Sequence, residues 1–153
     1  MNNRKRNIKA TLLGILVIAV IAFIWTNSAL DSDTSHKLSN MFLRWLFPNS
    51  DGADNNLTSF LLRKAAHFTE YAVLGTTVGI VAVFMRKNYG KVFVGLSLFG
   101  ILMVAVIDEF IQSFSDRTSL VADILLDFSG AVVGLLLTVA VFRLVKYIKF
   151  RKK

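Results

Sequence analysis

Four long apolar runs, each separated from the next by a polar segment, organise the chain. The first covers residues 10–25 and contains no charged side chain. Because a helix needs about 20 mostly apolar residues to cross a bilayer, each run is long enough to span when its polar ends reach the interface. The pattern predicts an all-α integral membrane protein with one domain over residues 1–153. Its four transmembrane helices are expected to form a bundle over residues 8–27, 57–85, 92–112 and 119–142.

The first apolar run has an alternative interpretation as a signal peptide, because basic residues precede it. The apolar core of a signal peptide is usually about 7 to 15 residues long and ends at a small-x-small cleavage site. Here the run reaches Trp25, and the segment that follows it, 26–30, matches such a site poorly. These features favour a first helix that is retained.

Between the first two runs, residues 36–47 carry large apolar side chains at helical spacing. They predict a short amphipathic helix in the first outer loop that ends at Pro48. Such a helix either lies flat on the bilayer surface or packs over the mouth of the bundle. The apolar positions are Leu38, Met41, Phe42, Trp45 and Leu46.

The charged residues indicate how the helices are oriented. Thirteen of the eighteen Lys and Arg residues lie before the first run, in the turn at 86–91, or in the tail at 143–153. All ten acidic residues lie in the segments at the other ends of the helices. Cytoplasmic loops carry an excess of Lys and Arg, so both termini are predicted to be cytoplasmic. A net charge of +8 would also fit nucleic-acid binding, but topology explains the basic clusters, and we expect the lipid bilayer as partner and no nucleic acid.

Three helices become polar at matching depth near their predicted outer ends. Charged side chains inside a membrane are rare and usually face the protein interior or water. Nothing in local sequence requires this match, so the pattern predicts a shared polar cavity that faces outward. The side chains concerned are Arg63, Lys64, His67, Glu70 and Tyr71 on the second helix, Asp108, Glu109 and Gln112 on the third, Asp123 and Asp127 on the fourth, and Arg117 in the loop between.

The predicted cavity holds more acidic than basic side chains. A surplus of carboxylates in a low-dielectric place requires protonation, a protonated His67, or a bound cation. A divalent metal, a cationic ligand group and a general acid all satisfy this requirement, so the metal dependence stays open. Cysteine is absent, which excludes thiolate ligands and cysteine nucleophiles. Structural alternatives also stand: Arg63 and Lys64 as interface anchors, and His67 with Glu70 as an interhelical hydrogen bond.

Small residues predict where the helices approach each other closely. Gly75 and Gly79 lie four residues apart on the second helix, and Gly130 and Gly134 do so on the fourth. Gly-x-x-x-Gly faces permit close helix contact in membranes. We expect the bundle to pack tightly below the polar residues.

Three motifs, read in order, resemble the VanZ-like family of small bacterial membrane proteins. They are Lys64-Ala-Ala-His67-Phe-Thr-Glu70-Tyr71, Asp108-Glu109-Phe-Ile-Gln112, and Arg117 followed by Asp123 and Gly130. The chain departs from the family pattern at Ser115-Asp116, where a Pro-Gly turn is typical, and at Asp127, where Asn is typical. The resemblance implies a multi-pass protein of the bacterial plasma membrane, in a family whose founding member gives teicoplanin resistance.

The resemblance and the polar residues together suggest a role at the outer membrane face on a lipid-linked or cell-wall precursor. In an enzymatic version, an acid/base hydrolase or transferase, His67 or Glu70 exchanges protons and Asp108, Glu109 and Asp123 position substrate, water or a cation. A non-enzymatic protein that binds a ligand or partner is the alternative, and a small transporter or proton relay is a third. The expected ligand-binding residues are Arg63, Lys64, Tyr71, Gln112, Arg117 and Asp127.

Overall fold

A computed structural model describes residues 2–29, 55–90, 92–114 and 120–151, together with Lys37 and Met41. In these residues the protein is helical and contains no β-strand. Its helices are α1 (Asn3–Ser28), α3 (Asn55–Tyr89), α4 (Val94–Gln112) and α5 (Val121–Arg151). All four are long and apolar enough to cross a membrane, which confirms, for the described residues, the prediction of four such helices and no sheet. The predicted helix over 36–47 lies outside the described residues, apart from Lys37 and Met41.

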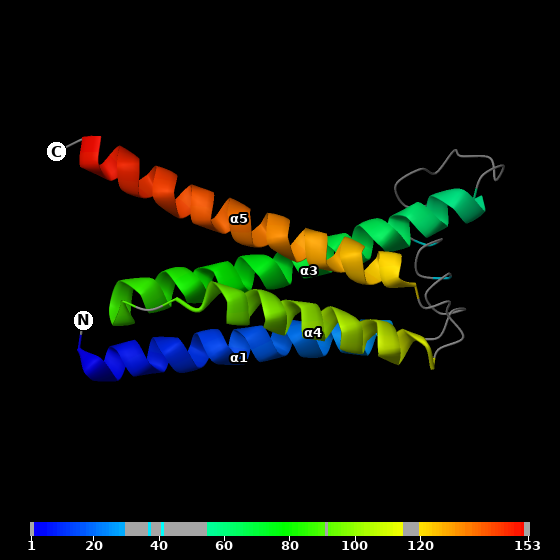
Figure 1. Cartoon of the computed structure of the whole chain (residues 1–153), viewed down its shortest axis with the longest axis horizontal. Helices are drawn as coiled ribbons and strands as arrows, with labels where there is room; N and C mark the ends of the chain where they lie inside the picture. Colours follow the sequence, from blue (N-terminus) through cyan, green and yellow to red (C-terminus); the bar gives the residue numbers. More distant parts are fainter. Residues whose placement is uncertain are drawn as a thin grey trace.

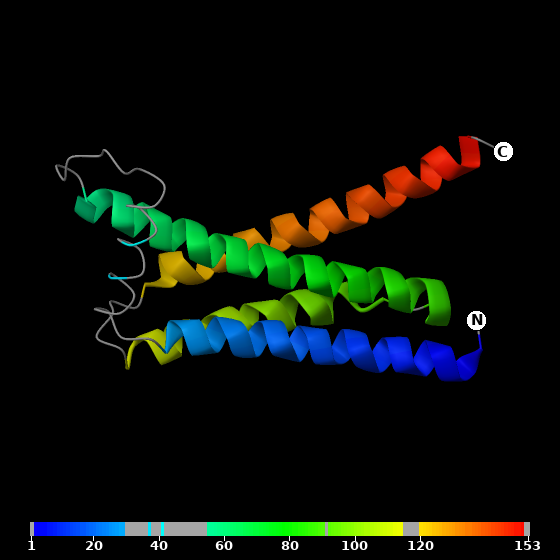
Figure 2. The same cartoon turned by 180° about the vertical axis from the view of Figure 1, so that it is seen from behind.

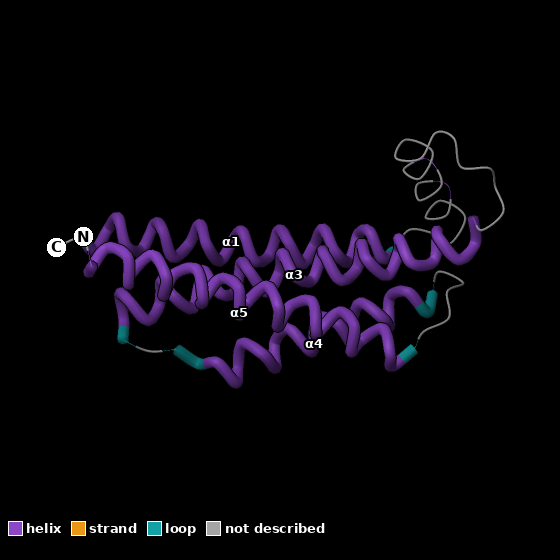
Figure 3. Tube along the Cα trace, turned by 90° about the horizontal axis from the view of Figure 1, so that it is seen from above, coloured by secondary structure: helices purple, strands orange, loops and turns teal. Residues whose placement is uncertain are grey.

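The four helices lie side by side, with both termini at the same end of the bundle (Figure 1). The opposite view shows the same arrangement (Figure 2). Contacts run around the bundle in the order α1, α3, α5, α4, and the interface between α3 and α5 is the largest. Figure 3 shows the four helices from above. At the terminal end, the Arg6 guanidinium lies 5.0 Å from the centre of the Tyr89 ring, which places the start of α1 beside the end of α3.

The first, second and last of these helices extend beyond the expected bounds at this terminal end, whereas α4 begins at Val94, two residues after its expected start. The first helix begins at Asn3 rather than at residue 8, and Asn2 caps it by accepting a hydrogen bond of 3.2 Å from the Arg4 amide. The last helix continues past residue 142 to Arg151. The tail contains no Pro or Gly to end the helix, and Lys and Arg near a helix C-terminus interact favourably with its dipole. Residues 141–150 are exposed, because this part of α5 diverges from the other helices (Figure 1).

Glycines set the close contact between α3 and α5, as the Gly-x-x-x-Gly spacing predicts. A Cβ atom on Gly75 would overlap the carbonyl group of Ala131, and one on Gly134 would overlap that of Ala72. At this contact Thr76 donates a hydrogen bond from Oγ1 to the Gly134 carbonyl, at 3.4 Å. The two backbones thus touch where side chains would separate them.

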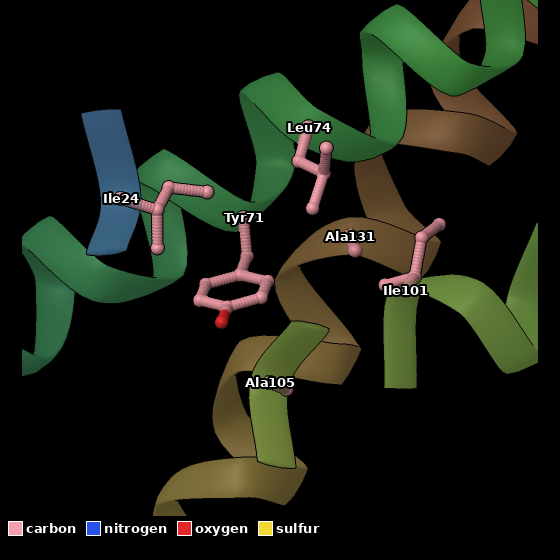
Figure 4. Packing of buried hydrophobic residues seen from close by; sticks show 6 residues of the cluster. All are labelled: Ile24, Tyr71, Leu74, Ile101, Ala105 and Ala131. Carbon is pink, nitrogen blue, oxygen red and sulfur yellow. The ribbon is translucent and has the colours of Figure 1, made fainter. Parts of the chain in front are cut away.

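The apolar core is small and lies between all four helices (Figure 4). Many large apolar side chains are instead exposed on the outside of the bundle, among them Ile18, Phe99 and Leu136. An apolar exterior of this kind is the surface that a bilayer covers. The buried apolar side chains are Ile24 of α1, Tyr71 and Leu74 of α3, Ile101 and Ala105 of α4, and Ala131 of α5.

Candidate functional site

Polar side chains from all four helices meet inside the bundle, toward the end opposite the termini. Asp108 and Asp127 are 0% and 1% exposed, so two acidic residues are buried as completely as the apolar core. Burying a charge is costly unless other groups compensate it. We call this group the polar cluster; it comprises Ser28, His67, Glu70, Tyr71, Asp108, Glu109, Gln112 and Asp127.

Asp108 of α4 lies at the centre of the polar cluster. Its Oδ2 atom accepts a hydrogen bond of 3.2 Å from Gln112 Nε2, one turn further along the same helix. The same nitrogen lies 3.5 Å from Ser28 Oγ of α1. On the other side, His67 Nδ1 of α3 lies 3.9 Å from Asp108 Oδ2. Asp108 therefore lies beside α3 directly and is linked to α1 through Gln112.

Tyr71 follows His67 by one helical turn and faces the same group of acids. Its side chain is fully buried, and its ring points into the space between α3, α4 and α5 (Figure 4). The phenol interacts electrostatically with Asp108 and Asp127. The spacing of four residues therefore places an imidazole and a phenol on one face of α3, toward the acids.

Two other acids accept hydrogen bonds from residues outside their own helix. Asn27 of α1 donates a hydrogen bond of 2.6 Å from Nδ2 to Glu70 Oε1. The backbone amide of Leu120 donates one of 2.7 Å to Glu109 Oε1, immediately before α5 begins. Glu109 thus fixes the entry of the chain into the last helix.

Lys64 and Asp123 form an ion pair nearer the end of the bundle, between α3 and α5. Their side chains are 26% and 19% exposed, in contrast to the buried acids below them. We call this the rim pair. It connects the same two helices whose glycines touch further along.

Asp127 has a different environment from the other acids. It is buried on α5, and its Oδ1 atom has no hydrogen-bond partner. It interacts electrostatically with Asp108, Glu109 and Asp123. His67, Asp108 and Asp127 each supply one possible metal-ligand atom, and these three atoms all lie within 4.8 Å of one another.

The structure brings most of the predicted site residues together. His67, Tyr71, Asp108, Glu109, Gln112 and Asp127 lie in the polar cluster with Glu70, and Lys64 and Asp123 form the rim pair. Arg63 is half-buried on α3 close to Lys64, and Arg117 lies outside the described residues.

Sequence reasoning missed the contribution of the first helix. At its end, Asn27 contacts Glu70 and Ser28 contacts Gln112. From sequence alone, these two residues were considered only as part of a segment that matches a signal-peptide cleavage site poorly. The sequence did contain a signal for this contribution: the first apolar run ends in the polar residues Thr26-Asn-Ser28, at the same depth as the polar stretches of the other helices.

An apolar groove of about 610 Å³ opens on the side of the bundle between α1 and α3. Its walls are mostly apolar side chains, such as Val20, Phe23 and Leu62. Glu70 also lines this groove, so the groove reaches the polar cluster through one carboxylate.

Four membrane-spanning helices around buried acidic residues define a small multi-pass membrane protein with a polar interior. Residues 13–143 match the VanZ/LLP1 family, and the chain belongs to that family. The match confirms the resemblance carried by the three motifs. No curated protein and no solved structure matches the chain.

Proposed function

We propose that this VanZ/LLP1-family protein binds a lipid-linked cell-envelope molecule at the outer face of the bacterial plasma membrane and thereby affects resistance to glycopeptides such as teicoplanin. The observation that carries the proposal is the convergence of polar side chains from all four helices at the end of the bundle remote from the termini. A structural protein has little use for so many acids inside a membrane.

The orientation comes from the distribution of charge. The basic N-terminus, the 86–91 turn and the basic tail belong to the terminal end of the bundle, and Lys and Arg mark the cytoplasmic side. The polar cluster then lies toward the outer surface, where its residues line a polar cavity.

A lipid-linked ligand fits the two kinds of surface that meet at Glu70. The groove between α1 and α3 is lined mostly by apolar side chains, as an acyl or prenyl chain requires. Glu70 connects the groove to the polar cluster. A chain in the groove would thus place its headgroup toward the polar cluster, with Arg63 and the rim residue Lys64 on the same helix as cations for a phosphate or carboxylate.

The His67–Asp108 pair supports chemistry on the bound molecule. The Asp108 carboxylate lies beside the His67 imidazole, and a carboxylate that orients an imidazole is an arrangement that general acid–base catalysis uses. In this version the protein is a hydrolase or transferase, with Glu70, Glu109 and Asp123 positioning substrate or water. Binding without chemistry is the alternative, and it is favoured by the partners that these three acids already have.

The proposal is tested by measuring teicoplanin susceptibility of bacteria that express the protein. His67→Ala and Glu109→Ala are expected to abolish any resistance while the protein is still inserted at the wild-type level. Gly100→Ala is the control, because nothing lies within 4 Å of a Cβ atom there. Resistance that persists in both site variants would contradict a role for the polar cluster.

Binding and chemistry are separated with the purified protein in nanodiscs that contain a polyprenyl-diphosphate-linked precursor. An enzyme predicts that His67→Ala still binds the precursor and no longer converts it. A binding protein predicts no conversion by the wild type at all.

A further inference from the structure

We infer that His67, Asp108 and Asp127 hold a divalent transition-metal ion at the centre of the polar cluster. The three residues come from three helices, α3, α4 and α5. This site goes beyond the proposed function, because metal binding is measurable without any envelope lipid.

The geometry of the three side chains suits a metal. One ligand atom from each lies within 4.8 Å of the other two. Zinc holds imidazole nitrogen and carboxylate oxygen at about 2.0 to 2.2 Å, so its tetrahedral ligands lie about 3.4 Å apart. Small side-chain rotations therefore suffice to bring the three atoms onto one ion.

Two buried oxygens among these residues have no hydrogen-bond donor. They are Oδ1 of Asp127 and Oδ1 of Asp108, on side chains that are 1% and 0% exposed. Ser28 and Tyr71 lie beside the Asp108 carboxylate, yet neither hydroxyl has hydrogen-bond geometry to its Oδ1 atom. A buried acceptor without a donor is costly, and a metal ion satisfies such an acceptor directly.

The charge balance points the same way. The nearby cation of Lys64 is already paired with Asp123 at the rim. A protonated His67 would supply one positive charge against the two carboxylates of Asp108 and Asp127. A divalent ion bound by a neutral His67 balances both carboxylates.

Neighbouring groups are placed to orient the ligands. Gln112 donates to Asp108 Oδ2 and so restricts the rotation of that carboxylate. Groups that hydrogen-bond to metal ligands fix their orientation in this way. Three protein ligands also leave one position of a tetrahedral site open for water or a substrate oxygen.

The ligand types select the class of metal. One imidazole nitrogen with two carboxylates suits Zn²⁺ or Mn²⁺, whereas Mg²⁺ and Ca²⁺ prefer oxygen ligands throughout. We therefore expect Zn²⁺ and Mn²⁺ to bind more tightly than Mg²⁺.

The test uses the full chain, purified in detergent, stripped with a chelator and titrated with Zn²⁺, Mn²⁺ or Mg²⁺ in separate samples. Calorimetry and elemental analysis after dialysis are expected to show one Zn²⁺ or Mn²⁺ per chain and weaker binding of Mg²⁺. Absence of saturable binding of Zn²⁺ and Mn²⁺ by the wild-type protein would overturn the inference.

Matched variants locate the ion. His67→Ala and Asp127→Asn are expected to weaken binding by at least about tenfold, since even groups outside the ligand set contribute about that much. Asp127→Asn keeps the shape of the side chain and introduces the residue typical of the family, so it is expected to fold. Equal binding by the wild type and both variants would place the metal elsewhere and refute this site.

Two controls match these changes. His36→Ala removes the other histidine of the chain, and Asp123→Asn removes a carboxylate one turn before Asp127 that is already paired with Lys64. Both are expected to keep one metal per chain. Loss of the metal in either control, with helicity unchanged, would contradict the assignment of the ligands.

Discussion

Asn27, in the last turn of α1, donates a hydrogen bond of 2.6 Å from its side-chain amide to Oε1 of Glu70 on α3. The two residues are 43 positions apart, so this contact exists only when the first and second spans lie side by side. Ser28, the next residue, is fully buried against α4. The end of α1 is therefore part of the polar cluster and holds one of its acids in place.

Replacing Asn27 should destabilise the bundle, because Glu70 would lose its donor inside the protein. For Asn27→Ala we expect a loss of about 0.5 to 1.5 kcal/mol in the free energy of unfolding. Asn27→Asp should cost more, since it places one carboxylate against another. The measurement is reversible unfolding in detergent micelles, followed by circular dichroism.

Thr26→Ala is the control for this pair, because Thr26 donates a hydrogen bond of 2.7 Å to Ala22 of its own helix. Its stability should lie near that of the wild type. If Asn27→Ala is as stable as Thr26→Ala, the contact with Glu70 contributes nothing measurable to the fold.

Gly134→Ala should separate α3 from α5. The added methyl group would overlap the carbonyl of Ala72, and backbone atoms cannot move aside as a flexible side chain does. Overpacking of this kind costs about 1 to 3 kcal/mol. Thermal melting of the purified protein measures the loss.

Gly100→Ala is the matched control, because no atom lies within 4 Å of a Cβ atom at this position. Alanine is the better helix former, so this variant should be as stable as the wild type or slightly more stable. Equal melting temperatures for the two glycine variants would show that the α3–α5 backbones are not in contact.

The rim pair should tolerate exchange of its two charges. Lys64→Glu and Asp123→Lys each place like charges together and should lower stability, and the double variant should recover most of the loss. Because both side chains are partly exposed, we expect a coupling of about 0.5 to 1 kcal/mol from a double-mutant cycle. Purely additive effects would mean that the ion pair does not connect α3 and α5.

The proposed topology predicts which positions a membrane-impermeant maleimide reaches in intact cells. The natural chain has no cysteine, so single-cysteine variants need no prior removal of thiols. Ser113→Cys, just after α4, should be labelled from outside, whereas Lys87→Cys and Lys146→Cys should react only after lysis. If Lys87→Cys is labelled in intact cells and Ser113→Cys is not, the orientation is the opposite of the proposed one, and the polar cluster lies toward the cytoplasm.

The sequence alone was enough to predict the number and kind of helices. Each helix that crosses a bilayer needs a long apolar segment, and such a segment can be recognised from its own residues without knowledge of the rest of the chain. The role of Gly75 and Gly134 was also predictable from sequence, because glycine in a membrane helix lets a neighbouring helix approach closely. Helix ends were harder to predict: nothing in the basic tail stops α5, which continues to Arg151.

The candidate residues were also identifiable from sequence, since charged groups stand out in apolar runs. Their partners were not. Asp123 and Asp127 share one face of α5 at a spacing of four residues, yet Asp123 pairs with Lys64 at the rim and Asp127 is buried opposite His67 and Asp108. Periodicity gives the face of a helix and leaves open how far that helix is rotated and which helices are its neighbours.

Only the tertiary structure decided that the stretch Arg63 to Tyr71 divides between two environments, with Lys64 paired at the rim, His67 partly buried beside Asp108 and Tyr71 fully buried. It also decided that α1 supplies Asn27 and Ser28 to the same group. The physical reason is that hydropathy acts on each segment separately. The pairing of buried polar groups depends instead on distances between segments that only the packed bundle determines.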